Sequence, residues 1–276
     1  MQKMAIVVLT ACAIHLPLMA QDGFIARWQK RATQTQMKQP AWAPPLVTTF
    51  VELIQVYRAD FFRQSTSNQV ETWNLDGGKG LALIPAANTE LDIDLPPYLE
   101  HSAATVANGA GDMSFLLKYR FLAGNAKSGN YVVSAFLSAT LPTGSYKNGS
   151  ADATVAPNVA LGKGFGWFDV QSTLGATLPT RDTATLGRSI AWNIAAQAHV
   201  ARYFWPQIEF NSTYYKGGPN DGSAQTFVTP GLLVSHELGG DRHSRLAVCA
   251  GAGEQIATST FYTYNHEVVV TTRLLF

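Results

Sequence analysis

Short stretches in which apolar and polar residues alternate fill the chain from about residue 50 to its end. The alternation is clearest between residues 111 and 121. One face of this stretch carries Met113, Phe115, Leu117, Tyr119 and Phe121. The other face carries Asp112, Ser114, Lys118 and Arg120, with the apolar Leu116 as an exception. Because successive side chains of a β-strand point to opposite faces, the pattern predicts a strand with one apolar and one polar face.

The same alternation recurs along the chain and predicts an all-β protein. Residues 89–95 and 168–178 repeat it, with Asp and Glu or Gln and Thr between apolar positions. Clusters of Gly, Asn, Asp, Ser and Pro separate the stretches, as expected of turns. The resulting prediction is an antiparallel sheet of about twelve strands, near residues 51–63, 70–83, 89–101, 111–121, 130–141, 152–163, 167–178, 189–202, 205–215, 225–237, 244–256 and 263–276.

The connections between these strands fall into two sets. The short set consists of residues 84–88, 164–166 and 203–206. The longer polar set consists of residues 102–110, 142–151, 179–188 and 216–224. Residues 122–129 and the linker near Ala257 blur the contrast. Transmembrane β-barrels have short periplasmic turns, longer external loops and an even number of strands, so the two sets favour an antiparallel transmembrane β-barrel.

The first 45 residues differ from the rest. Residues 1–20 combine Lys3, a short apolar run over residues 5–14 and a Leu-Met-Ala ending, which predicts a secretory signal peptide. Residues 21–45 are rich in Gln and basic residues and end in the string QPAWAPP. We expect a periplasmic leader, interpreted as a solvated tail, with a soluble interaction arm as the alternative. The barrel domain then covers residues 46–276.

Composition agrees with a membrane barrel. Charged residues make up 14% of the chain, well below the roughly 25% of soluble domains, although the hydrophobic share is an ordinary 46% and the mean hydropathy is +0.01. A barrel reconciles these values, because only alternate residues of each strand need be apolar. The net charge of +1 gives no reason to expect a nucleic-acid partner. After removal of the signal, Cys249 is the only cysteine, and an intramolecular disulfide is excluded.

The chain ends in an imperfectly amphipathic stretch that closes with Phe276. One face carries Val268, Val270, Thr272 and Leu274, and the other carries Glu267, Val269, Thr271, Arg273 and Leu275. Such an ending resembles the assembly signal of outer-membrane barrels, which makes the barrel assembly machinery an expected partner. The alternative is the edge strand of a soluble domain.

Four strings in the middle of the chain carry a resemblance to a known family. They are residues 79–85 (KGLALIP), 94–98 (DLPPY), 111–120 (GDMSFLLKYR) and 139–144 (ATLPTG). With these strings, most of residues 46–276 resembles the family described as the meta-pathway of phenol degradation outer-membrane proteins. The resemblance implies an outer-membrane barrel associated with the uptake of small, often aromatic or apolar compounds. It supplies no catalytic residues, and the leader matches none of its motifs.

No motif in the sequence predicts catalysis, a cofactor or a metal site. His199, Glu209 and Ser212 would be the candidate members of a hydrolase site on a barrel wall, but no spacing selects them. The predicted inward face is more informative, since polar groups at membrane depth must face partners or water. The candidate lumen-lining residues are Arg58, Asp60, Glu90, Asp92, Asp94, Lys118, Arg120, Asp169, Gln171, Asn193, Gln197, Glu209, Asn211, Glu267 and Arg273. They can line a wet path or form a network that seals the lumen.

The sequence therefore favours a non-enzymatic passive channel in the bacterial outer membrane, in contact with outer-membrane lipids and a small-molecule solute. About twelve strands enclose more room than a filled eight-stranded barrel and less than a sixteen-stranded porin. Two alternatives remain open. They are a barrel hydrolase and a structural barrel with a sealed lumen.

Overall fold

The computed structural model describes residues 23–145, 148–238 and 246–276. The expected signal peptide over residues 1–20 lies outside the described residues. Among the described residues, helix α1 (Phe24–Gln36) comes first, and residues 37–55 after it form no further helix or strand. The strands that follow are β1 (Val56–Ser65), β2 (Glu71–Asp76), β3 (Gly80–Ala86), β4 (Thr89–Asp94), β5 (Tyr98–His101), β6 (Gly109–Ala110), β7 (Met113–Gly124), β8 (Tyr131–Leu141), β9 (Thr154–Phe165), β10 (Phe168–Pro179), β11 (Arg188–Ala198), β12 (Phe204–Lys216), β13 (Ala224–Glu237), β14 (Ala247–Ala257) and β15 (His266–Leu275), with helix α2 (Thr183–Leu186) between β10 and β11.

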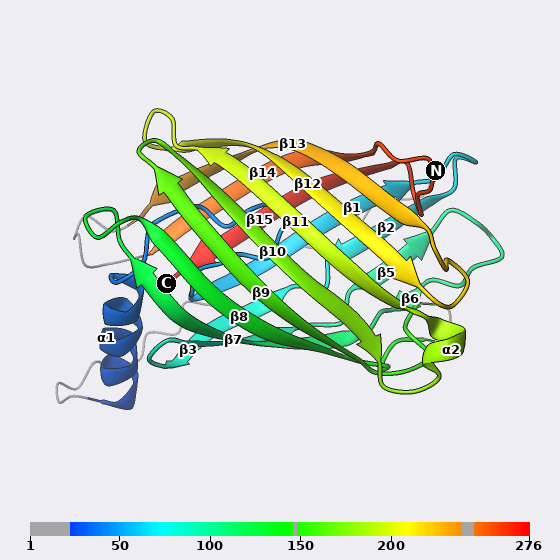
Figure 1. Ribbon diagram of the computed structural model, residues 1–276, viewed down its shortest axis with the longest axis horizontal. Helices are drawn as coiled ribbons and strands as arrows, with labels where there is room; N and C mark the ends of the chain where they lie inside the picture. Colours follow the sequence, from blue (N-terminus) through cyan, green and yellow to red (C-terminus); the bar gives the residue numbers. More distant parts are fainter. Residues whose placement is uncertain (1–22, 146–147, 239–245) are drawn as a thin grey trace, which may run out of the picture.

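The strands close into one antiparallel barrel (Figure 1). From β7 to β15 each strand pairs with the next one along the chain, and β15 also pairs with β1, from Val56 opposite Leu275 to Ser65 opposite His266. This seam removes the unpaired edges that an open sheet would leave. In three places two consecutive strands lie end to end and together take the place of one strand in the wall, which we call a stave. These pairs are β2 with β3, β4 with β5 and β6 with β7. Fifteen strands minus three give twelve staves, which confirms the predicted number.

Local backbone chemistry explains two of the breaks within staves. Gly77 and Gly78 have φ values of +66° and +62°, in the left-handed region that favours glycine. A Cβ on Gly77 would lie 2.6 Å from both the Cβ of Asp60 and the ring of Phe62, so only glycine fits at this position, directly after the end of β2. Pro96 and Pro97 follow β4 and have no amide hydrogen to donate to a neighbouring strand.

The alternation read from the sequence is confirmed by side-chain burial. Leu117, Tyr119 and Phe121 are 52%, 47% and 58% exposed on the outside of β7, whereas Lys118 and Arg120 are buried. The same holds in β15, where Val268, Val270 and Leu274 face outward and Glu267, Thr271 and Arg273 are buried. The apolar set therefore forms the outer surface of the barrel, as in transmembrane barrels, and the polar set faces the lumen.

No helix among the described residues is long and apolar enough to cross a membrane.

The two ends of the barrel differ. Helix α1, the end of β15 and the turns at residues 87–88 and 166–167 lie at one end, and α2 lies at the other (Figure 1). Trp28 anchors α1 at the rim by donating its indole N–H to the Ile84 carbonyl at 2.7 Å.

Two expectations about the N-terminal region are wrong. The first strand starts at Val56 rather than at residue 51, and residues 39–45 are largely buried rather than solvated. Both errors have one cause. Residues 37–55, which we call the inner segment, enter the barrel, where the wall supplies partners for an irregular backbone that water would otherwise solvate.

We expect a lipid-facing charge to destabilise this barrel. Leu137 is half exposed near the middle of β8, and replacing it with Arg should lower the free energy of unfolding by about 2 to 4 kcal/mol. The control is Leu186→Arg in α2, outside the strands, which should change stability by about 0.5 kcal/mol or less. Urea unfolding in lipid vesicles measures both. Equal effects of the two substitutions would contradict the proposed membrane-facing surface.

Candidate functional site

The lumen of the barrel is occupied by the inner segment. Leu46, Thr48, Val51, Leu53 and Gln55 are each at most 1% exposed. The segment holds few hydrogen bonds of its own, because it forms neither helix nor strand. Buried backbone groups without partners cost several kcal/mol each in a membrane, so the wall must satisfy them. The candidate site is therefore the contact between the inner segment and the polar inner face of the wall.

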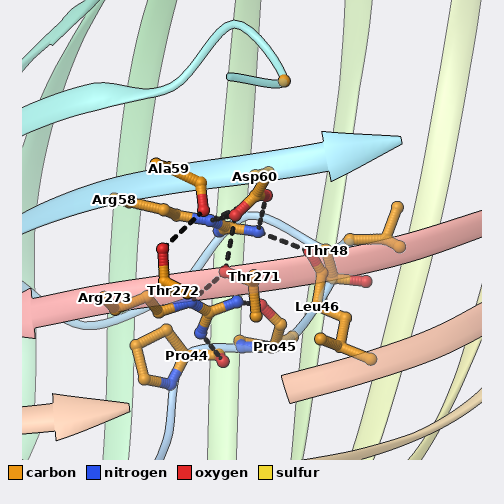
Figure 2. A network of polar contacts seen from close by, with 12 residues as sticks. Pro44, Pro45, Leu46, Thr48, Arg58, Ala59, Asp60, Thr271, Thr272 and Arg273 are labelled. Atoms are coloured by element: carbon orange, nitrogen blue, oxygen red, sulfur yellow. Dashed lines mark hydrogen bonds and ion pairs between the residues drawn. The ribbon is translucent and has the colours of Figure 1, made fainter. Parts of the chain in front are cut away.

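Two arginines on either side of the seam hold the carbonyls at the centre of the segment (Figure 2). Arg273 on β15 donates to the carbonyls of Pro44 and Pro45, the latter at 2.7 Å. Arg58 on β1 donates to the Leu46 carbonyl at 2.5 Å. Guanidinium groups suit this role because they present several donors in a fixed fork.

Neighbouring side chains hold these two arginines in position. Asp60 accepts from Arg58 at 2.6 Å and from the hydroxyl of Thr271 at 2.5 Å, and the Thr271 hydroxyl in turn accepts from Arg273 at 3.0 Å. Because Asp60 lies on β1 and Thr271 on β15, this network crosses the seam (Figure 2). These bonds fix the two guanidinium groups in the positions from which they contact the segment.

Glu209 on β12 binds the backbone just after this point. Its carboxylate accepts the N–H groups of Leu46, Val47 and Thr48 at 2.8, 3.0 and 2.6 Å. Three consecutive N–H groups around one anion form a nest, and hydrogen bonds to a charged acceptor are about twice as strong as neutral ones. The Gln207 amide donates to the same carboxylate at 2.8 Å.

Neighbouring amides extend this contact along the wall. Gln197 donates to Gln207 at 2.5 Å, and Gln171 donates to Gln197 at 3.0 Å. Gln171 also reaches the Ala43 carbonyl at 3.4 Å. A row of amides on β10, β11 and β12 thus orients Glu209, and Gln171 contacts the segment just before residues 44–48, which we call its central bend.

The end of the inner segment is held on the opposite wall. Glu90 on β4 pairs with Lys118 on β7 and accepts the Ile54 N–H at 2.5 Å, while Lys118 donates to the Glu52 carbonyl at 3.1 Å. Arg120 donates to the side-chain oxygen of Gln39 at 2.6 Å. The Ser134 hydroxyl on β8 donates to the Val51 carbonyl at 2.8 Å. Within the segment itself, the Gln39 side chain donates to the Leu53 carbonyl at 2.7 Å and accepts from the Leu53 N–H at 3.1 Å.

Glycines in the wall make room for the side chains of the inner segment. A Cβ on Gly231 or Gly253 would lie 2.3 or 2.7 Å from the Leu46 Cδ1 atom, and a Cβ on Gly162 would lie 2.5 Å from the Trp42 ring. Leu116, the apolar exception on a polar face, lies in a buried cluster with Val51. The wall thus matches the segment in shape as well as in hydrogen bonding.

The structure brings most of the candidate lumen-lining residues to this contact. Those that bond the inner segment directly are Arg58, Glu90, Lys118, Arg120, Gln171, Glu209, Asn211 and Arg273. Those that bond members of this set are Asp60, Asp169, Asn193 and Gln197. Of the remaining candidates, Asp92 is partly buried beside Glu90, whereas Glu267 accepts from Gln64 at 2.6 Å and Asp94 accepts from Ser114 at 3.0 Å.

Sequence reasoning missed three wall residues and the segment that they serve. Gln207, Thr271 and Ser134 are buried and face inward, but their residue types are common on any polar face. The one available signal was Leu116, an apolar side chain in an otherwise polar set, which indicates an apolar contact inside the lumen.

The three candidate hydrolase residues do not meet. Glu209 is committed to the inner segment, and the Ser212 hydroxyl lies 2.9 Å from that of Thr226. The His199 ring lies parallel to Trp205 with 4.2 Å between ring centroids, and its Nε2 is 3.0 Å from the Arg202 carbonyl. This arrangement provides no nucleophile and base within reach of each other.

Comparisons with known proteins agree with this architecture. The family model described as "Putative MetA-pathway of phenol degradation" matches residues 54–263. The comparison with curated proteins gives no match. The COG4313 outer membrane channel from Pseudomonas putida F1 is 15% identical, with a TM-score of 0.55 over 85% of this chain and 100% of that chain. The NanC porin is 9% identical, with a TM-score of 0.51 over 80% of this chain and 98% of that chain. The fold is thus that of outer-membrane channel barrels.

Arg273→Gln should loosen the inner segment. The shorter amide cannot reach both proline carbonyls, and each lost hydrogen bond to a charged group is worth about 1.5 to 3 kcal/mol. Chymotrypsin cleavage after Trp42 and Phe50 should therefore become at least about tenfold faster. Arg63→Gln is the control, since Arg63 pairs with Glu71 at a half-exposed position away from the segment. Equal cleavage rates in the two variants would refute the role of Arg273.

Proposed function

The chain belongs to the family described as "Putative MetA-pathway of phenol degradation", and on this premise we propose that it is an outer-membrane channel for the passive uptake of small hydrophobic or aromatic compounds. One observation carries the proposal. The closed barrel has a polar lumen that is occupied by a part of its own chain, held largely by hydrogen bonds, beside a remaining cavity of about 460 Å³. The family description supports the link to phenolic compounds.

The size of the solute is limited by the room that remains. Twelve staves enclose less space than a sixteen-stranded porin, and the inner segment fills the centre. A hydrated sugar or peptide would need the segment to leave the lumen altogether. A compound with one aromatic ring needs much less displacement, and it has little hydration to lose. The proposal therefore requires a channel that is narrow at rest and passes small, weakly hydrated solutes when the segment shifts.

A structural barrel with a sealed lumen is the second candidate function. The hydrogen bonds to the segment support it, since the charged wall residues around the central bend are committed to the segment. The two candidates respond differently when those bonds are weakened. A channel should then conduct more, and a structural barrel should lose stability without conducting.

We propose that the protein resides in the outer membrane and that β15 directs its assembly there. The support for assembly is the outward apolar face of β15 and the aromatic residue that comes after it. Phe276 also donates its backbone N–H to the Gln55 carbonyl at 3.2 Å, so the residue after β15 contacts the inner segment.

Weakening the central contacts should raise conductance. In planar bilayers we expect the wild type to show small, brief openings, and the double substitution Glu209→Gln with Arg273→Gln to increase mean conductance several-fold. The reason is that glutamine at position 209 would lose the negative charge and replace one of the two acceptor oxygens with an N–H₂ group, which cannot accept from a backbone N–H, while two carbonyls lose their arginine. Arg63→Gln serves as the control. Unchanged conductance in a folded double variant would favour the sealed structural barrel.

Uptake by cells tests the solute class. Cells that express the protein should take up radiolabelled phenol at micromolar concentration faster than cells that lack it, because the asymmetric outer membrane slows its passage through lipid. Uptake of a hydrophilic compound of similar mass should not change. Equal phenol uptake in the two strains would contradict the proposed function.

A further inference from the structure

A cavity of about 460 Å³ opens beside the inner segment at the end of the barrel where β15 ends. We call it the vestibule. The inner segment contributes Trp42 and Phe50 to its lining, and the wall contributes His199, Trp205 and Leu275. Its volume lies within the roughly 300 to 1,000 Å³ typical of small-molecule sites. The cavity therefore has room for a small solute while the central bend of the segment keeps its contacts with the wall.

Aromatic rings dominate the vestibule. Trp205 is 7% exposed, and its ring is parallel to that of His199 within 5° at a centroid distance of 4.2 Å. Tyr203 and His236 lie 5.5 Å apart at the same rim. Trp42 contacts three separate apolar clusters of the lumen, so its position is fixed from several sides. Rings held in this way offer flat faces to a flat ligand, and offset stacking is the geometry that aromatic pairs prefer.

Polar residues also line the vestibule. Ser235 lines the cavity on the inward face of β13, where it pairs with the buried Cys249, so its hydroxyl can bond the hydroxyl group of a ligand. Its charged lining residues are Glu52, Arg202 and Glu237, so carboxylates outnumber the one guanidinium. An anionic ligand would meet more repulsion than attraction there, and it would also lose its hydration on leaving water.

We propose that the vestibule is a binding site for a neutral compound of one aromatic ring and one hydroxyl group, which occupies it on the way out of the lumen. This inference rests on the proposed channel function and adds to it the position and chemistry of the solute site. The ring stacks among Trp42, Phe50 and Trp205, and the hydroxyl bonds Ser235. A mostly apolar pocket with a few placed polar groups is the usual form of such a site.

Isothermal titration of the purified full-length protein in detergent tests the proposal with phenol as the probe. Phenol should bind saturably with one site per chain. Cyclohexanol, which has similar size and the same hydroxyl but no flat ring, and benzoate, which is anionic, should each bind at least about tenfold more weakly, a difference of about 1.4 kcal/mol. Equal binding of cyclohexanol or benzoate would overturn the proposal.

Substitutions locate the site. Trp205→Leu should weaken phenol binding about tenfold, whereas the matched control Trp192→Leu, on the outward face of β11, should leave it unchanged. Phe50→Leu gives a second test on the inner segment should Trp205→Leu fail to fold, as judged by heat-modifiable migration. Equal loss with the control would indicate partition into the detergent belt and would refute the site.

The same experiment separates this inference from the channel function. Saturable binding that depends on Trp205, without phenol uptake by cells, would keep the site and reject the channel. Uptake by cells without saturable binding would keep the channel and reject the vestibule as its solute site.

Discussion

The structure depends on one requirement, that every buried backbone group in the lumen of a membrane barrel finds a partner. A buried peptide group without one costs several kcal/mol. The inner segment has no helix or ladder of its own, and two of its residues at the central bend are prolines. The wall therefore supplies the partners, with arginines for the carbonyls of Pro44 to Leu46 and a carboxylate for the N–H groups of Leu46 to Thr48. A charged side chain is destabilising at membrane depth when it has no partner, but here each one stabilises the fold because it bonds buried backbone groups.

This requirement couples the inner segment to barrel closure. Arg58 and Arg273, which hold its centre, belong to the first and last strands, and Asp60 and Thr271 join these strands across the seam. The last residue of the segment, Gln55, pairs with the last residue of the chain, Phe276. The side chains that hold the inner segment are thus among those that join the first strand to the last.

The fold was largely readable from the sequence, whereas the content of the lumen was not. Period-two alternation marks a strand locally, so β7, β10 and β15 and their inward polar faces could be predicted from neighbouring residues. The breaks after Asp76 and Asp94 were missed, because each stave keeps its direction across them. The inner segment was missed because its partners are remote: Leu46 and Glu209 are 163 positions apart. A string such as QPAWAPP has no periodicity, and a solvated tail would look the same. Leu116 alone hinted at an apolar contact inside.

Amide hydrogen exchange of the full-length protein in lipid bilayers tests the central claim most directly. The account predicts that the amides of Leu46, Val47, Thr48 and Ile54 exchange as slowly as those in the middle of β12, because Glu209 and Glu90 bind them inside the lumen. Exchange of these four amides within seconds, at the rate of an exposed loop, would mean that the segment is solvated and would contradict the account.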